Sequence, residues 1–281
     1  MSTPDFVVIG HVVRDLTPEG WRLGGTATFA AVQAQRLGLR AGIVTRISSD
    51  VSPSEALPGV AFAGRASDRT TSFQNIYERG RRRQRVPAQA AAVEAQDVPA
   101  AWQRAPISLV GPVCREVPPT MASSLSSPLI GVSAQGWLRT LDRERHVRRR
   151  AWRGEPFWSN AHVLFVSRED LGRRQDQVDR WLDDVPVVVV TRDRGGARVH
   201  ERRRWRAMDA FPADEVDPTG AGDIFAAAFL VRYHETNDTT HAMRFAGAAA
   251  ACAVEAPGVE RVATRDVIEQ RMAQHPEIDV R

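Results

Sequence analysis

Short apolar runs, each of strand length, recur along most of this sequence and alternate with segments that favour helix. The runs are rich in Val, Ile and Leu, and they comprise residues 6–10, 41–47, 107–112, 128–134, 162–167 and 186–191. Runs without polar alternation are typical of strands that are buried on both faces of a sheet. Helix-favouring segments lie between several of them, such as residues 24–38 and 168–182. This order predicts an α/β fold with a largely parallel central sheet that is covered on both faces.

Residues 70–87, TTSFQNIYERGRRRQRVP, depart from this alternation. The stretch is polar and β-prone, and it carries a central Arg-Gly pair. It predicts a hairpin outside the main core, either as a lid over a site or as a plain surface excursion. No repeat or low-complexity linker divides the chain. We therefore expect one domain, residues 1–281, to which residues 66–88 contribute a small β lid.

The composition is that of a globular protein, with 43% hydrophobic and 26% charged residues. No apolar run approaches the roughly 20 residues that a membrane span needs. The first residues, MSTPDFVVIG, have no basic segment before their apolar run, which argues against an export signal. The two cysteines form neither a disulfide framework nor a metal site. These features predict a cytoplasmic protein with no membrane partner.

All 38 basic residues are arginine, and they face 34 acidic residues. Arginine clusters at 79–85, 143–150 and 201–206 are the only features that suggest nucleic-acid binding. They alternate with other residues between the predicted elements, so a solvated surface is the favoured interpretation. The absence of lysine excludes a Walker A loop and Schiff-base catalysis.

The stretch DPTGAGDIFAAAFL, residues 217–230, carries the strongest indication of chemistry. Gly220 and Gly222 allow backbone N–H groups to point into one concavity, and the small residues that follow favour a closely packed helix. A helix N-terminus with free N–H groups binds anions, phosphate above all. A carboxylate beside such a site, here Asp223, suits phosphoryl transfer, because it can take the proton of an attacking hydroxyl. We expect the helix dipole to keep Asp223 ionised; a capped glycine turn is the structural alternative.

The same stretch resembles the C-terminal signature of the ribokinase-like (PfkB) family of sugar kinases. Three further segments resemble the family in the expected order: VVIGHVVRDLTP (7–18), LGGTATFAAVQAQRLG (23–38) and PVVVVTRDRGGARVH (186–200). The resemblance spans residues 6 to 273. It implies a three-layer ribokinase-like fold, a small β lid, ATP with Mg²⁺ as the phosphoryl donor, and a sugar or polyol hydroxyl as the acceptor.

Carried over to this chain, the resemblance assigns a role to each matching residue. It makes Asp223 the catalytic base and gives the anion hole to the amides of Gly220, Ala221 and Gly222. The acceptor would be held by Asp15, Gly24 and Gly25. The nucleotide side would include Ser167, Thr191, Gly196, Asp217 and Thr219. Asp170 occupies the position of the acid that organises Mg²⁺ in many members.

Several positions differ from the usual family pattern. Phe29 replaces a common Asn, either as an apolar wall of the acceptor site or simply as a core residue. Asp193 replaces a glycine of the nucleotide turn, where Asp tolerates left-handed geometry better than most residues. Phe29, the lid sequence and residues 133–139 together look most similar to the branch that contains inositol kinases. In that branch Gln135 and Arg139 would face the acceptor.

Other classes lack their signatures in this sequence. The first strand is not followed by the glycine-rich loop of a dehydrogenase, the serine elbow G-x-S-x-G is absent, and the seven histidines are scattered. A nucleoside kinase of the same family remains an alternative. So does an inactive sensor of sugars or nucleotides, although a sensor has no need of Asp223. A homodimer formed through the lids is a further expectation of the resemblance.

Overall fold

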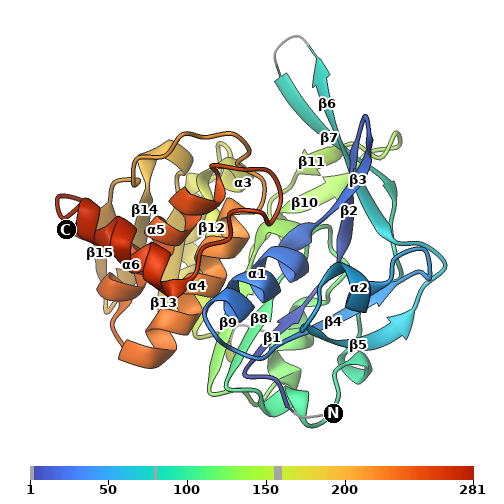
Figure 1. Cartoon of the computed structure of the whole chain (residues 1–281), viewed down its shortest axis with the longest axis horizontal. Coiled ribbons are helices and arrows are strands. Elements are labelled where there is room, and N and C mark those ends of the chain that lie inside the picture. Colours follow the sequence, from blue (N-terminus) through green and yellow to red (C-terminus); the bar gives the residue numbers. More distant parts are fainter. Residues whose placement is uncertain (1–2, 79–80, 155–159) are drawn as a thin grey trace.

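A nine-stranded sheet forms the centre of the molecule in the computed structural model, which describes residues 3–78, 81–154 and 160–281 (Figure 1). Its strand order is β15-β14-β13-β12-β9-β8-β1-β4-β5. Neighbouring strands from β13 to β5 are parallel, whereas β14 and β15 are antiparallel. The bounds are β1 Phe6–Ile9, β4 Ala41–Ile47, β5 Ala61–Ala66, β8 Ile107–Val110, β9 Leu129–Ser133, β12 Val163–Ser167, β13 Val187–Thr191, β14 Ala197–Glu201 and β15 Arg204–Met208. The predicted α/β class and the predicted strands are confirmed.

The two faces of this sheet are covered differently. On one face lie the helices α1 (Gly25–Arg36), α4 (Ala221–Thr236), α5 (Thr239–Ala253) and α6 (Arg265–Gln274), packed against alternate residues of the strands. The other face is covered mainly by short 3₁₀ segments and by the buried Trp102, Trp137, Trp152 and Trp181. The strands alternate between the two cores, since Phe6 and Val8 face the helices and Val7 and Ile9 face the tryptophans.

Two helix predictions differ in outcome. The segment 24–38 forms α1, and Gly38 lies beyond its end with a φ of 90°. The predicted helix over 168–182 is wrong: α3 covers only Arg168–Leu171, and a 3₁₀ segment follows at Gln175–Trp181. The chain turns at Gly172, where a φ of 58° and a ψ of −121° are incompatible with continued helix. The short α2 (Pro53–Ala56) is the remaining helix of the described residues.

A second, four-stranded sheet stands beside the first at one end of the molecule (Figure 1). We call it the small sheet; it consists of β3 (Gly20–Gly24), β2 (Val13–Thr17), β6 (Thr71–Glu78) and β7 (Arg81–Ala88) in that order. The β6–β7 pair is the predicted hairpin, and its tip at 79–80 lies outside the described residues. β2 and β3 are not among the predicted strands, because their sequences, VRDLT and GWRLG, lack the continuous apolar run of the central strands. The hairpin of β10 (Arg139–Leu141) and β11 (Val147–Arg149) adjoins β7 through a bridge between Arg85 and His146.

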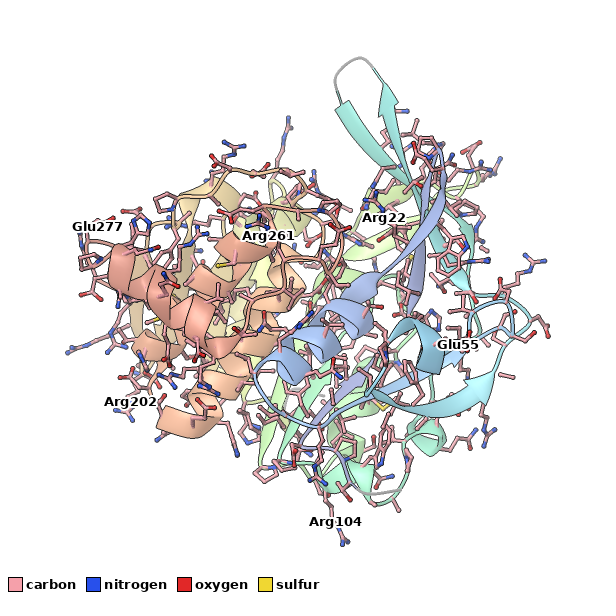
Figure 2. The ribbon with its side chains drawn as sticks, in the orientation of Figure 1. Arg22, Glu55, Arg104, Arg202, Arg261 and Glu277 are labelled. Atoms are coloured by element: carbon pink, nitrogen blue, oxygen red, sulfur yellow. The ribbon has the colours of Figure 1, made fainter. Side chains whose placement is uncertain are left out.

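The three arginine clusters belong to three separate hairpins, β6–β7, β10–β11 and β14–β15. Arg202 and Arg104 point outward from the periphery of the molecule (Figure 2). Across the described ranges, no helix has the length and apolar character required to cross a membrane.

Candidate active site

The loop before α4 brings backbone amides to the carboxyl end of the parallel strands. Gly220 is the N-cap of α4 and adopts the left-handed conformation, with a φ of 83°. A Cβ at this position would also lie 2.5 Å from the ring of Phe29, which is 1% exposed. Glycine is required here twice, because L-residues avoid this φ and because the buried ring occupies the space. Phe29 is therefore a core residue whose ring packs against the loop before α4.

Two of the amides in this loop lack a protein partner. The Thr219 amide donates to Asp217 Oδ1 (2.9 Å), and the Ala221 amide donates to the Pro218 carbonyl (3.3 Å). The amides of Gly220 and Gly222 have no acceptor within the parts of the chain that the structure describes. Unpaired amides at the positive end of a 16-residue helix form an anion site. The geometry thus supports the predicted anion hole, with the Ala221 amide already engaged.

Asp223 lies in the first turn of α4, with its carboxylate against α1. Thr26 Oγ1 donates a hydrogen bond to Asp223 Oδ1 (2.7 Å), and Thr26 is fully buried. Burial raises the pKa of Asp223 to about 6, although Thr26 and the charge of Arg139 act to lower that pKa. Desolvation therefore outweighs the two opposing effects, but a pKa of about 6 still leaves Asp223 ionised at neutral pH, as the sequence predicted. A carboxylate with a pKa near 6 is a better general base at neutral pH than an ordinary aspartate.

One cavity of about 830 Å³ connects these groups. Of the residues predicted for the site, all line this cavity except Gly24 and Asp217: they are Asp15, Gly25, Phe29, Gln135, Arg139, Ser167, Asp170, Thr191, Gly196, Thr219, Gly220, Ala221, Gly222 and Asp223. Asp217 instead uses its carboxylate to fix the Thr219 amide. Gly24 is buried, and it leaves room for the carboxylate of Asp15, which a Cβ at this position would displace. Both residues therefore shape the site without lining the cavity.

The small sheet and its neighbours form one side of the cavity, where the sequence predicts the acceptor to bind. Asp15, on β2, points its carboxylate toward the backbone at Gly24, the N-cap of α1. Phe73, Val113 and Val147 supply apolar wall there. These three residues were not predicted for the site, because they come from three distant segments that only the fold brings together. Arg83, Arg148 and Arg149, from two of the arginine clusters, also line the cavity.

Asp170, the predicted metal residue, is engaged by protein donors. Its Oδ2 accepts from Ser167 Oγ (2.7 Å) and Gln135 Nε2 (3.3 Å), and its Oδ1 accepts from Arg139 (3.3 Å). Ser167 also caps α3 by accepting from the Asp170 amide (2.9 Å). Asp170 therefore joins α3 to Gln135 and Arg139, the two residues predicted to face the acceptor.

Carboxylates gather at another side of the same cavity, near the residues predicted to bind the nucleotide. Burial and the negative charges of Glu169, Asp170 and Glu215 raise the pKa of Asp193. Among the described residues, Glu169, with 67% of its side chain exposed, pairs with Arg149 at 3.4 Å. Mg²⁺ prefers oxygen ligands and keeps several waters, so an acidic wall of this kind suits a hydrated Mg²⁺ that accompanies phosphates. The sequence singled out Asp170, but Glu169 is the more accessible carboxylate.

Another part of the cavity lining is largely apolar. Thr191 and Gly196 line the cavity, and Gly196 has a φ of 77°. Asp193 adopts a φ of 51°, as predicted for the residue that replaces glycine in this turn. Small and apolar residues form the wall next in the chain, namely Met208, Ala210, Phe211, Pro212, Ala213, Gly247, Ala250, Ala251 and Val254. This composition suits a flat heterocycle more than a charged group.

Comparison with known proteins agrees with this geometry. Residues 157–265 match the family model described as pfkB family carbohydrate kinase. The chain carries a PfkB family carbohydrate kinase domain. It is 27% identical over 252 residues to the cytidine kinase of Thermococcus kodakarensis, an alignment that covers 82% of this chain and 88% of the relative. This match confirms the family resemblance seen in the sequence. The named relatives are kinases, which is the enzyme class that the resemblance implies.

Solved structures of the ribokinase family share the fold of this PfkB protein. A pyrophosphate-dependent kinase complexed with a pyrophosphate analog and myo-inositol superposes with a TM-score of 0.78 at 20% identity, and the match covers 94% of this chain and 99% of the other. Arabidopsis thaliana ribokinase complexed with ribose and ATP gives a TM-score of 0.72 at 17% identity, over 96% and 99% of the two chains. At these identities, the likeness concerns the fold alone.

Proposed function

We propose that this PfkB protein transfers the γ-phosphoryl group of ATP to a hydroxyl of a sugar or a cyclic polyol such as myo-inositol. One observation carries the proposal: Asp223, with a pKa of about 6, lies beside the unpaired amides of Gly220 and Gly222. A general base and an anion hole within one helical turn are the two parts that phosphoryl transfer to an alcohol requires.

In the proposed mechanism, the acceptor hydroxyl lies between Asp15 and Asp223. Asp223 Oδ1 is held by Thr26, and Oδ2 has no hydrogen-bond partner in the described part of the chain, so Oδ2 takes the hydroxyl proton. The hydroxyl oxygen attacks the γ-phosphorus as the bond to the β-phosphate oxygen breaks. The amides of Gly220 and Gly222 stabilise the negative charge on the transferring group.

The donor end supports ATP. The apolar slot around Phe211 and Gly247 would hold the adenine, while Thr219 would lie beside the phosphates. Mg²⁺, which neutralises phosphate charge, would be held through water by Glu169, Asp170 and Asp193. Inorganic pyrophosphate is the donor that competes with this assignment, and it would leave the apolar slot empty.

A nucleoside is the second candidate acceptor. The alignment to the cytidine kinase covers most of both chains. The apolar wall of Phe73, Val113 and Val147 would suit a base as well as the carbon face of a polyol. An inactive sensor of such small molecules is the non-enzyme alternative, and the intact base and anion hole argue against it.

We further propose that residues 1–281 act as one kinase domain and that the small sheet serves as its lid. The predicted segment 66–88 would then be only half of that lid, since β2 and β3 complete the sheet. Closure would exclude water from the reacting phosphate. The homodimer through the lids and the cytoplasmic location stay predictions.

A matrix of donors and acceptors tests the proposal. ATP or pyrophosphate is combined, with Mg²⁺, with myo-inositol, hexoses, pentoses and nucleosides, and phosphorylated product is measured by mass spectrometry. ATP-dependent phosphorylation of a polyol or a sugar is the expected result. Phosphorylation of nucleosides alone would favour the second acceptor, and turnover with pyrophosphate alone would overturn the ATP assignment. Binding of acceptors without any turnover would favour the sensor.

A further inference from the structure

We infer that Thr26 is a positioning residue for the catalytic base: it fixes the Asp223 carboxylate so that one oxygen is held and the other faces the acceptor. This inference rests on the proposed function of Asp223. It assigns a role to a residue that neither the sequence motifs nor the family match singled out. The contacts of the Thr26 side chain fix its orientation.

Thr26 is held in one orientation by its surroundings. It lies in the first turn of α1, directly after the Gly24–Gly25 pair, and it is fully buried. Its methyl group Cγ2 fills the space in front of Gly111, so closely that a Cβ at Gly111 would collide with it. With the methyl group packed there, Oγ1 lies 2.7 Å from Asp223 Oδ1 and donates its hydrogen bond to that atom. A β-branched side chain packed in this way has little freedom to choose another rotamer.

The contact joins the two helices that carry the two halves of the chemistry. The N-terminus of α1 lies beside Asp15 at the acceptor end, and the N-terminus of α4 carries the anion hole and the base. The hydrogen bond between Thr26 and Asp223 links two residues that are 197 positions apart in the sequence. Since a hydroxyl that donates to a carboxylate favours its ionised form, Thr26 also opposes the effect of burial on the Asp223 pKa.

The chain offers a matched control on the same helix. Thr28 is also fully buried, but its hydroxyl has no hydrogen-bond partner among the described residues. Thr26→Val and Thr28→Val therefore remove the same atom from the same helix, two residues apart. Only the first substitution removes a contact with the base. Thr26→Ser keeps the hydroxyl and loses only the methyl group.

The experiment measures kcat, both KM values and the pH dependence of kcat for these variants and for Asp223→Asn. A hydrogen bond to a charged group corresponds to about a ten-fold effect or more. We expect Thr26→Val to lower kcat about ten-fold and to move its acidic limb up by about one pH unit, with both KM values little changed. Thr28→Val should match the wild type, and Thr26→Ser should restore most of kcat. Gly111→Ala, which displaces Thr26 without altering its hydroxyl, should shift the limb in the same direction as Thr26→Val.

The outcomes separate this inference from the proposed function. If Asp223→Asn is inactive while Thr26→Val keeps the wild-type pH profile, the positioning role is wrong and the base assignment stands. If Asp223→Asn retains wild-type turnover, the base assignment itself is wrong. If Thr26→Val and Thr28→Val lower kcat equally without moving the limb, the effect is one of packing, which also overturns the inference.

Discussion

The cavity lies between two bodies that differ greatly in packing. The large sheet buries two extensive cores, and α4, which packs on it, carries Asp223 and the amides of Gly220 and Gly222 at its N-terminus. The small sheet contributes to a cluster of only five buried apolar residues: Val13, Phe73, Val86, Val113 and Cys114. The groups that perform chemistry are thus attached to the stable body, whereas part of the acceptor wall belongs to the body that is easier to move. This division is what a site needs when it must hold a base rigidly and still admit a substrate.

The largest expected effect comes from the rigid body. Asp223→Asn should lower kcat by about 10²–10⁴-fold, the range for loss of a general base, while ATP still binds. The measurement is steady-state turnover together with ATP titration by calorimetry. Asp217→Asn is a control from the same loop, because an Asn can still accept from the Thr219 amide. Equal losses in the two variants would contradict the distinction between base and loop support.

The packing contrast is tested directly by a pair of phenylalanines. Phe229, on α4, is fully buried in the large core, and Phe229→Ala should cost about 3–5 kcal/mol in the free energy of unfolding. Phe73→Ala, in the small sheet, should instead open that sheet locally, with a smaller change in global stability and a higher KM for the acceptor. Urea unfolding and hydrogen exchange distinguish the two results. Equal global losses would show that the small sheet unfolds with the large body.

Two glycine substitutions test how tightly the loop before α4, which forms the predicted anion hole, is packed. Gly220→Val forces a β-branched residue to a φ of 83° and against Phe29, so we expect a loss of about 2 kcal/mol or more in stability. Gly222→Ala meets no atom within 4 Å, and its effect on stability should stay within the range of about 0.5–1 kcal/mol for a Gly-to-Ala change in a helix. Thermal unfolding measures both. A large destabilisation by Gly222→Ala would contradict the open surface assigned to it.

The raised pKa of Asp223 gives the most specific effect, because it depends on pH. The folded-state pKa of about 6 exceeds the ordinary value of 3.8, so the protonated form is favoured by folding. The stability that this gives is present below about pH 4 and is lost as pH rises through 6. Asp223→Asn should therefore be more stable than the wild type above pH 6, on the order of 2 kcal/mol, and equal to it below pH 4. Melting temperatures of the variant and the wild type across this pH range test the prediction. A stability difference that did not depend on pH would contradict the raised pKa of Asp223 as its cause.

The sequence alone determined the order of elements and the chemistry of the central loop. Runs such as residues 187–190 are wholly apolar, which favours burial on both faces within a parallel sheet. Gly220 and Gly222 before a run of small residues were likewise sufficient to predict a helix N-terminus with free amides. These are local properties, and local periodicity and backbone freedom report them directly.

Only the tertiary structure decided which side chains meet. The predicted helix at 168–182 failed because Gly172 turns the chain, and propensity does not record that turn. Thr26 and Asp223 are brought within 2.7 Å by the packing of α1 on α4, and Asp170 is turned toward Arg139 rather than left for a metal alone. The pKa of Asp223 also depends on burial by distant segments, which outweighs the Thr26 hydrogen bond and the charge of Arg139. Desolvation and contact across the fold are sums over many residues, and the sequence near one residue does not contain them.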